Sequence, residues 1–283
     1  MNHSRLKTVL GSFPDTPGVY LFFGTGDLLL YVGKSRTLRS RIRSHFFSRD
    51  ERRLRRKVRR IEVRETAGEL GALLLESKLI KDLRPLYNVA ARQRRRIVLA
   101  RKSETRLGYV GVELEAVDSL KPDDAFRVLG VFKHTTQAKE FLAGISKGYR
   151  LCPKLLGLER SRGRCFSSHL GRCNGACVGD EAPTTYNARL EAAFEERRVK
   201  AWPYEGSVLV EEQSADRGLN ESFLIDNWCL LASTRTTGND VQEHAHQSHR
   251  FDYDSYKILY SFLTDPVNQL LIRTVERAGE NKV

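Results

Sequence analysis

The feature that most constrains this sequence is a carboxylate on the apolar stripe of a long predicted helix. The helix is expected from about Ala67 to Leu83, and Pro85 ends it. Glu76 lies midway, and the residues that share its helical face are Ala72, Leu73, Leu79 and Ile80. An unpaired buried carboxylate is costly, so it is normally neutralised, paired or bound to a metal ion. The pattern therefore predicts a metal ligand, with a salt bridge to Lys34 or Arg41, or a position at the solvent rim, as the alternatives.

The segments before this helix have the pattern of a small sheet. Residues 18–23 and 28–32 are rich in β-branched and aromatic residues, and the glycine-containing turn between them predicts a hairpin. A further short strand is expected at 61–64. A helix opening at a threonine cap is expected over about 37–47, and a basic helix over roughly 50–60. The first ninety or so residues are thus predicted to form an α/β domain.

Basic and phenolic groups are predicted to converge on the helix carboxylate. Arg41 and His45 are four residues apart and share a helical face, and Lys34 lies just before that helix. Tyr20 and Tyr31 lie on the paired strands. Hydrolysis of a phosphodiester needs a carboxylate for a hard metal ion, cations for the developing charge and a group that deprotonates water. The set favours that chemistry, with surface charge and cross-strand packing as the alternatives.

The net charge of +13 is concentrated in the first third of the chain. Residues 1–96 hold 23 Lys and Arg against 9 Asp and Glu, a net of +14, and the remainder holds 25 against 26, a net of −1. Such a positive electrostatic field favours binding to a polyanion, because each neutralised phosphate releases counterions. A solvated basic face without a partner is the alternative. The arginines expected to face DNA are Arg43, Arg52, Arg53, Arg55, Arg56, Arg94, Arg95 and Arg96.

Two classes of protein are disfavoured. No stretch approaches the about 18 consecutive apolar residues of a membrane helix, and the first residues lead into no signal-peptide core. No phosphate-binding loop of the GxxxxGK[ST] type occurs. We therefore expect a cytoplasmic, nucleoid-associated protein that does not itself hydrolyse ATP.

Four of the five cysteines lie within 26 residues: Cys152, Cys165, Cys173 and Cys177. In a reducing compartment such a tetrad indicates metal or iron–sulfur ligands rather than disulfides. The ligand type does not separate a 4Fe–4S cluster from tetrathiolate zinc. The absence of pairs spaced by two residues favours the cluster. The fifth, Cys229, lies in an apolar run and is expected in the core.

The first ninety residues resemble the GIY-YIG nucleases in five ordered segments. These are Gly18-Val19-Tyr20, Tyr31-Val32-Gly33 with Lys34, Leu38 to Phe46, Glu69 to Lys81, and Arg84 to Asn88. Within that family the resemblance extends to the amino-terminal half of the UvrC repair nucleases and to their stand-alone Cho-type homologues. Five ordered segments make a chance match improbable.

The resemblance implies a pocket lined by Tyr20, Tyr31, Lys34, Arg41, His45, Glu76 and Asn88. Glu76 would ligate a single Mg²⁺ or Mn²⁺, and Tyr31 would act as the general base or position the water. Arg41 and Lys34 would stabilise the scissile phosphate. His45 stands where the UvrC proteins usually carry Tyr, and this departure leaves its role open. Water would attack phosphorus in line, leaving 5′-phosphate and 3′-hydroxyl ends.

The resemblance also covers the later part of the chain. It implies a 4Fe–4S cluster on the cysteine tetrad, and the segments Trp202 to Tyr204 and Leu224 to Trp228 are similar to the carboxy-terminal part of Cho-type proteins. A UvrC protein would continue into a second nuclease domain, of which nothing occurs before Val283. The implied activity is a single incision on the 3′ side of a lesion in damaged double-stranded DNA bound by UvrB, with UvrA acting upstream.

The expected fold is α/β: a GIY-YIG nuclease domain at 1–96, with a three-stranded antiparallel sheet flanked by helices, followed by a mixed α/β domain at 97–283 that carries the four-cysteine site. In the second region we expect strands in 97–120, a threonine-capped helix at 135–146, a hairpin within 207–232 and a helix from 266 to about 277. His244, His246 and His249 are expected in a solvated loop.

Two other functions remain open at this point. One is a structure-specific or mobile-element GIY-YIG nuclease that acts without UvrB. The other is a non-catalytic nucleic-acid-binding module held together by zinc or a cluster.

Overall fold

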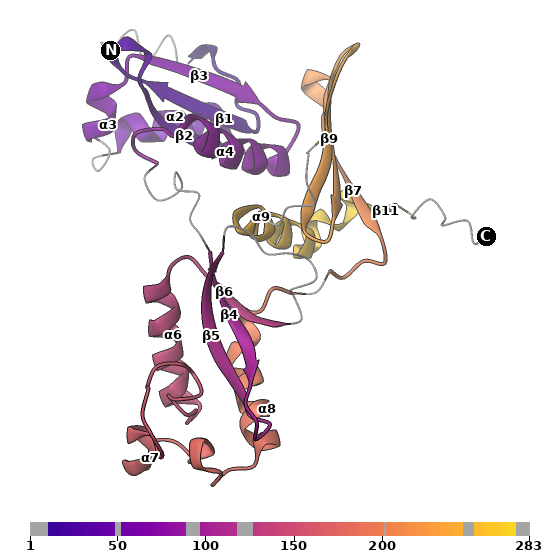
Figure 1. The fold of residues 1–283 in the computed structure, drawn as a ribbon. Coiled ribbons are helices and arrows are strands. Elements are labelled where there is room, and N and C mark those ends of the chain that lie inside the picture. The colour runs from indigo at the N-terminus through magenta and orange to yellow at the C-terminus, as the bar shows by residue number, and fades with distance from the viewer. Residues whose placement is uncertain are drawn as a thin grey trace, which may run out of the picture. The chain divides into compact units, whose positions relative to one another are not determined.

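The contacts of the chain divide it into two units (Figure 1). The computed structural model describes residues 11–48, 52–88, 97–117, 127–200, 202–245 and 252–275. The first unit comprises Met1–Arg94 with Trp202–Val283, and the second comprises Arg95–Ala201. The region expected as one domain at 97–283 is therefore shared between the two units. Hydrogen bonds from the carboxy-terminal strands to a helix near residue 70 account for this grouping.

The first unit begins with the predicted three-stranded antiparallel sheet, and its strand order is β2-β1-β3. Successive side chains of the central strand β1 point to opposite faces of the sheet. Both faces are buried, because a helix packs against each of them. Tyr20 and Phe22 pack against Ile42 of helix α2 on one face, whereas Val19 and Leu21 pack against Ile80 of helix α4 on the other. The elements are β1 (Gly18–Phe23), β2 (Leu29–Ser35), α2 (Leu38–Phe47), α3 (Arg52–Lys57), β3 (Arg60–Glu65) and α4 (Glu69–Leu83).

The carboxy-terminal part of this unit is a five-stranded sheet in the order β10-β9-β8-β7-β11, accompanied by one helix. Its elements are β7 (Ser207–Ser214), β8 (Leu219–Asp226), β9 (Cys229–Thr237), β10 (Asp240–Ala245), α9 (Tyr253–Thr264) and β11 (Ile272–Val275). The single hairpin predicted within 207–232 is thus part of a longer meander. His244 lies on β10 rather than in a loop, and His246 and His249 fall outside the described residues.

The prediction of a helix from 266 to about 277 was wrong. Asp265 does cap the segment, because its side chain accepts a hydrogen bond from Val267 N, but only a 3-10 turn follows (Pro266–Leu271). The chain then becomes β11, where Ile272 pairs with Val210 of β7. Pairing with the open edge of β7 is a tertiary effect that the local helix signal could not reveal.

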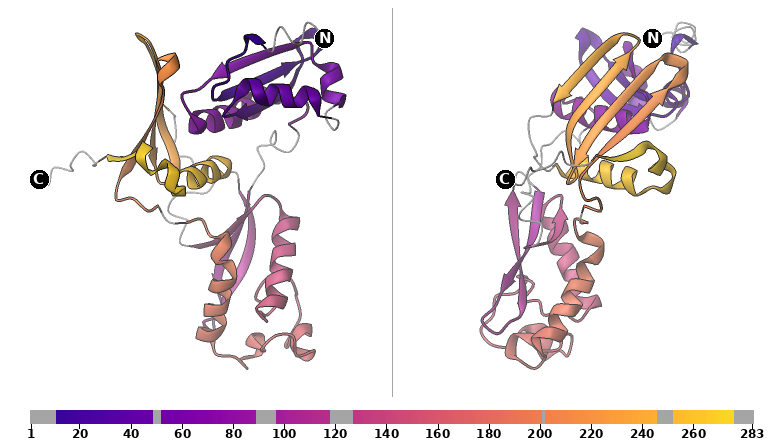
Figure 2. Two further views of the ribbon diagram at one scale, coloured as in Figure 1. Left: turned by 180° about the vertical axis from the view of Figure 1, so that it is seen from behind. Right: turned by 90° about the vertical axis from the view of Figure 1, so that its right-hand side faces the viewer.

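The second unit has a three-stranded antiparallel sheet in the order β5-β4-β6, with helices α6 and α8 on the same side of it (Figure 2). The predicted helix at 135–146 is confirmed as α6, but its cap is the His134 ring, which accepts from Gln137 N at 3.1 Å. The elements are β4 (Ile97–Glu104), β5 (Val110–Val117), β6 (Val128–Phe132), α6 (Thr135–Gly148), α7 (Phe166–His169) and α8 (Pro183–Phe194). Short 3-10 turns occur at Thr25–Asp27, Ala176–Val178, Glu195–Arg197 and Ala215–Arg217.

Among the described residues, no helix has both the length and the apolar character needed to cross a bilayer.

Candidate active site

Two tyrosines meet at a glycine on the central strands. Tyr20 is fully buried on β1 and pairs with Gly33 of β2. A Cβ at Gly33 would lie 2.4 Å from the Tyr20 hydroxyl oxygen and 2.8 Å from a ring carbon of Tyr31. Glycine therefore leaves the space that the phenol of Tyr20 occupies. The Tyr20 and Tyr31 ring centroids are 6.1 Å apart, so the strand register brings the two phenols together.

The Tyr20 hydroxyl is held by helix α2. It forms a hydrogen bond of 2.5 Å with His45 Nε2 and a further hydrogen bond with the Arg41 side chain. Arg41 and His45 reach the same phenol because their four-residue spacing places them on one helical face. Burial and the neighbouring Tyr31 raise the pKa of Tyr20 far above its ordinary value. The Tyr20 phenol is therefore protonated at neutral pH and acts in hydrogen bonding.

The Glu76 carboxylate faces this group of side chains. Its Oε1 accepts a hydrogen bond of 3.1 Å from the Lys34 backbone N–H. Burial raises its pKa, while Lys34 and Arg41 oppose that shift. The Glu76 charge in turn raises the pKa of Tyr20. The predicted apolar stripe thus places a partly buried carboxylate near Tyr20 and the Arg41 guanidinium.

The Lys34 ammonium pairs with Glu69 rather than with Glu76, the salt-bridge partner that the sequence suggested. Its Nζ donates to Glu69 Oε1 at 3.1 Å, and the Arg36 guanidinium binds the other Glu69 oxygen. Glu69 precedes Glu76 by two helical turns and so lies on the same face of α4. Glu69 was not among the predicted site residues, although its seven-residue spacing from Glu76 places both carboxylates on one helical face.

Asn88 ties the segment after α4 to strand β2. Its Oδ1 accepts from Val32 N at 2.9 Å, and its Nδ2 donates to Val32 O at 2.8 Å. Val32 lies between Tyr31 and Gly33. Asn88 therefore fixes the backbone beside the two phenols.

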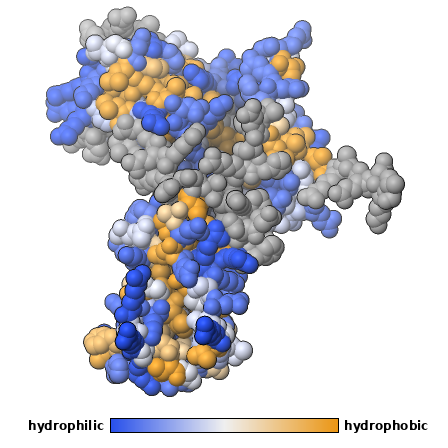
Figure 3. Space-filling view, in the orientation of Figure 1, coloured by the Kyte–Doolittle hydropathy of each residue, from blue (hydrophilic) through white to orange (hydrophobic). Residues whose placement is uncertain are grey.

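The arginines expected to face DNA fall into three groups. Those that are exposed are Arg43, Arg52, Arg53 and Arg56. Figure 3 shows the edge of the molecule at α3 as hydrophilic, next to a hydrophobic patch. Arg55 is half-buried and donates to the Phe46 carbonyl at 2.5 Å, so part of its bonding capacity serves the fold. Arg94, Arg95 and Arg96 lie outside the described residues.

The donor set at Glu76 fits a hard divalent cation. Carboxylate and phenol oxygens are hard ligands, and magnesium is usually bound through one or two carboxylates while it retains several waters. Because burial raises the pKa of Glu76, a cation beside it would stabilise the ionised form. Glu76 is the residue that would hold the ion.

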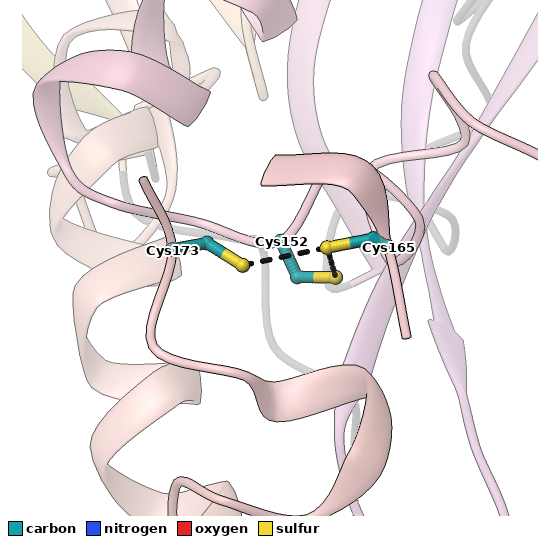
Figure 4. A group of neighbouring side chains, drawn as sticks. All are labelled: Cys152, Cys165 and Cys173. Atoms are coloured by element: carbon teal, nitrogen blue, oxygen red, sulfur yellow. Dashed lines mark hydrogen bonds between the residues drawn. The ribbon is translucent and has the colours of Figure 1, made fainter. Parts of the chain in front are cut away.

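Three of the four clustered cysteines converge in the second unit (Figure 4). The Cys165 Sγ lies 3.7 Å from Cys152 Sγ and 3.4 Å from Cys173 Sγ, and all three side chains are buried. Cys177 Sγ accepts a hydrogen bond of 3.4 Å from Cys165 N–H. Cys229 is buried in the other unit, as expected of a core residue.

The surroundings of these thiols fit a bound metal centre. Burial raises the pKa of Cys165 and Cys152, so a cation is needed to hold them as thiolates. The hydroxyl of Tyr186 is fully buried and has no hydrogen-bond partner among the described residues, although Cys152 and Cys173 both influence its pKa. A buried hydroxyl without a partner is unusual. A sulfur-ligated centre would give it an acceptor.

Three family models match consecutive parts of the chain. The UvrC-like GIY-YIG domain matches residues 16–89, the UvrC/Cho excinuclease middle domain 108–196, and the excinuclease Cho C-terminal domain 207–278. Excinuclease Cho of Escherichia coli is 39% identical over 258 residues, which cover 90% of this chain and 85% of that protein. The chain belongs to the excinuclease Cho family. It is accordingly an endonuclease of nucleotide excision repair with a GIY-YIG nuclease domain.

Two further similarities are more distant or more local. UvrABC system protein C of Desulforudis audaxviator is 33% identical over 188 residues, covering 63% of this chain and 29% of that protein. The crystal structure of the GIY-YIG endonuclease domain of UvrC from Thermotoga maritima, bound to magnesium, is 33% identical. The match covers 31% of this chain and 99% of that one, with a TM-score of 0.28.

Proposed function

We propose that this endonuclease makes a single incision on the 3′ side of a lesion in damaged double-stranded DNA. It acts in the cytoplasm, at the nucleoid, on DNA held by UvrB after loading by UvrA. The observation that carries the proposal is the convergence of Glu76, Arg41 and the two tyrosines at one place in a domain of excinuclease type. The exposed arginines of α2 and α3 would contact the phosphate backbone.

Each side chain of the pocket has a separate role in the proposed hydrolysis. A divalent cation held by Glu76 would supply positive charge to the scissile phosphate and lower the pKa of an attacking water. Tyr31, which is half-buried, accepts the proton of that water or orients it. Arg41 and Lys34 stabilise the charge that develops on phosphorus oxygens. The protonated Tyr20 acts in hydrogen bonding, joining Arg41 to His45, so we assign His45 to orienting this network.

We also propose that the cysteine centre holds a 4Fe–4S cluster on Cys152, Cys165, Cys173 and Cys177. Thiolate ligands and a buried hydroxyl that could donate to a cluster sulfur support this choice. Tetrathiolate zinc is the second candidate, and one observation favours it. The sulfur separations of 3.4 and 3.7 Å resemble those around a single tetrahedral ion with bonds of about 2.3 Å.

The incision is tested with purified protein and a lesion-bearing duplex in the presence of a UvrA and UvrB pair. Wild type, Glu76→Ala and the control Asp82→Ala, which changes an exposed acid on the same helix, are compared in magnesium and in chelator. Wild type and control should cut once on the 3′ side, and Glu76→Ala should not cut. Equal cutting by Glu76→Ala would refute the mechanism. Cutting of branched or specific-sequence DNA without partners would favour the partner-independent alternative.

The cysteine centre is tested by absorbance and metal analysis of protein purified without oxygen. A band near about 400 nm that bleaches with dithionite, together with iron and sulfide, would support the cluster. Stoichiometric zinc without that band would refute it. Tyr186→Phe should alter the reduction potential of a cluster, because it removes a donor to sulfur.

A further inference from the structure

Two carboxylates face each other on the buried side of the carboxy-terminal sheet. Glu212 of β7 pairs directly with Glu221 of β8, and their exposures are only 4% and 8%. They continue an otherwise apolar stripe that includes Val210 and Phe223. Like charges directly opposite each other destabilise a sheet, and buried carboxylates are costly. Their positions therefore require compensating partners.

Those partners are backbone amides at and just before the start of helix α4, together with the Arg235 side chain of β9. Glu212 accepts hydrogen bonds from Leu70 N at 2.8 Å and from Gly71 N at 2.9 Å. Glu221 accepts from Ala67 N at 2.9 Å and from the Arg235 guanidinium at 3.0 Å. The N-cap residue of α4 is a glycine without a capping side chain. The sheet thus supplies the acceptors that a helix N-terminus needs, from more than 140 positions away.

Two glycines make room for this contact. A Cβ at Gly68 would lie 2.3 Å from the Glu212 carboxyl carbon, and a Cβ at Gly71 would lie 2.3 Å from a Glu221 oxygen. Glycine inside a helix is less favourable than alanine, so Gly71 in the first turn needs a structural reason. The close approach of the carboxylates accounts for a glycine at each position.

The carboxyl end of α4 also contacts the carboxy-terminal part of the first unit, through helix α9. The Lys81 ammonium binds Asp252, which is the N-cap of α9 and accepts a hydrogen bond from Ser255 N at 3.2 Å. Glu76 lies between these two attachments. The helix that presents the proposed metal ligand is therefore fixed at both ends by the carboxy-terminal part of the first unit.

We propose that Glu212 and Glu221 are positioning residues for the nuclease pocket, holding the first turn of α4 so that Glu76 stays against strand β2. The inference rests on the proposed role of Glu76. It assigns a catalytic purpose to the carboxy-terminal sheet: the sheet holds the metal-binding helix in register with the two tyrosines. Groups that orient a metal ligand typically change metal affinity or activity by about tenfold or more when they are removed.

The test compares Glu212→Gln and Glu221→Gln with Glu211→Gln as a matched control. Glu211 lies on the same strand but on its other face, where it pairs with Arg273 at 3.3 Å. In magnesium-free protein, hydrogen exchange should quicken at Leu70 and Gly71 in Glu212→Gln and at Ala67 in Glu221→Gln, and should not change in Glu211→Gln. In the incision assay these variants should need about tenfold more magnesium for half-maximal rate, with KM for DNA unchanged.

Gly68→Ala provides an independent route, because it keeps both carboxylates and obstructs their approach. Like Glu212→Gln and Glu221→Gln, it should raise the magnesium concentration needed for half-maximal rate. Magnesium requirements equal to that of Glu211→Gln in all three variants would overturn the inference, even if exchange quickens. If Glu76→Ala cuts normally, the proposed function fails. If Glu76→Ala is inactive and these variants behave as the control, only the positioning role fails.

Discussion

The nuclease pocket and the cysteine centre hold their functional groups in different ways. The pocket groups lie on regular elements: Tyr20 and Tyr31 on paired strands, Glu76 on a helix of 15 residues. The cysteines lie mostly in turns between α6 and α8, a segment with five glycines at positive φ: Gly157, Gly163, Gly171, Gly175 and Gly179. The backbone hydrogen bonds of sheet and helix can form the pocket before any metal binds. The backbone hydrogen bonds of the cysteine segment are mostly those of short turns, so we expect its order to depend more strongly on a bound metal.

Removing a metal centre held by the four cysteines should produce the largest effect. Structural thiolate sites contribute apparent binding free energies of about 10 kcal/mol or more. Chelation or Cys165→Ser should therefore unfold the second unit, seen as lost helical circular dichroism. Both tryptophans of the chain, Trp202 and Trp228, lie in the first unit, so their fluorescence reports on that unit alone. Simultaneous loss of both signals would show that the first unit depends on the cysteine centre as much as the second does.

Tyr31→Phe should lower kcat by about a thousandfold, as expected when a positioned proton acceptor is removed. The fold should not change, because the ring contacts with Tyr20 and His45 remain. Tyr87→Phe, which alters an exposed tyrosine after α4, is the control. Single-turnover incision rates measure the effect. A loss below about threefold would remove Tyr31 from the proton transfer.

Gly33→Ala should lower the incision rate by about a hundredfold, because the new methyl group displaces the Tyr20 phenol and misplacement of about 1 Å carries such a cost. Gly144→Ala adds a methyl group on α6, where nothing lies within 4 Å, and should leave the rate unchanged. The incision rates of the two variants, measured on the same DNA substrate, test this prediction. Equal rates would mean that the strand register does not set the position of Tyr20.

The smallest effect concerns pH. Burial raises the pKa of Glu76, so in the metal-free pocket its protonated form persists to higher pH than in an ordinary glutamate. Only the ionised form binds a cation. Metal affinity is therefore complete above that pKa and falls by up to about tenfold per pH unit below it. Calorimetric magnesium titrations between acidic and neutral pH measure this slope, and a flat profile would contradict the assignment.

Local patterns predicted much of the first unit. Alternation and turn residues predicted strands β1 to β3, and helical periodicity placed Glu76 on the buried stripe of α4. The Lys34–Glu69 bond and the capping of α4 by Glu212 were not predicted. Their partners lie 35 and more than 140 positions apart, and periodicity carries no information over such separations. The prediction of a helix after Asp265 was wrong for the same reason, because pairing with the distant strand β7 determines the conformation of this segment.

Binding of Mn²⁺ to the metal-free nuclease pocket, followed by electron paramagnetic resonance, tests whether Glu76 anchors the cation. Wild type and Asp82→Asn should bind one ion with the same affinity. Glu76→Gln, which keeps the size of the side chain and removes its charge, should lose that ion. Unchanged binding in Glu76→Gln would show that another group anchors the cation, and the account of the pocket would be wrong.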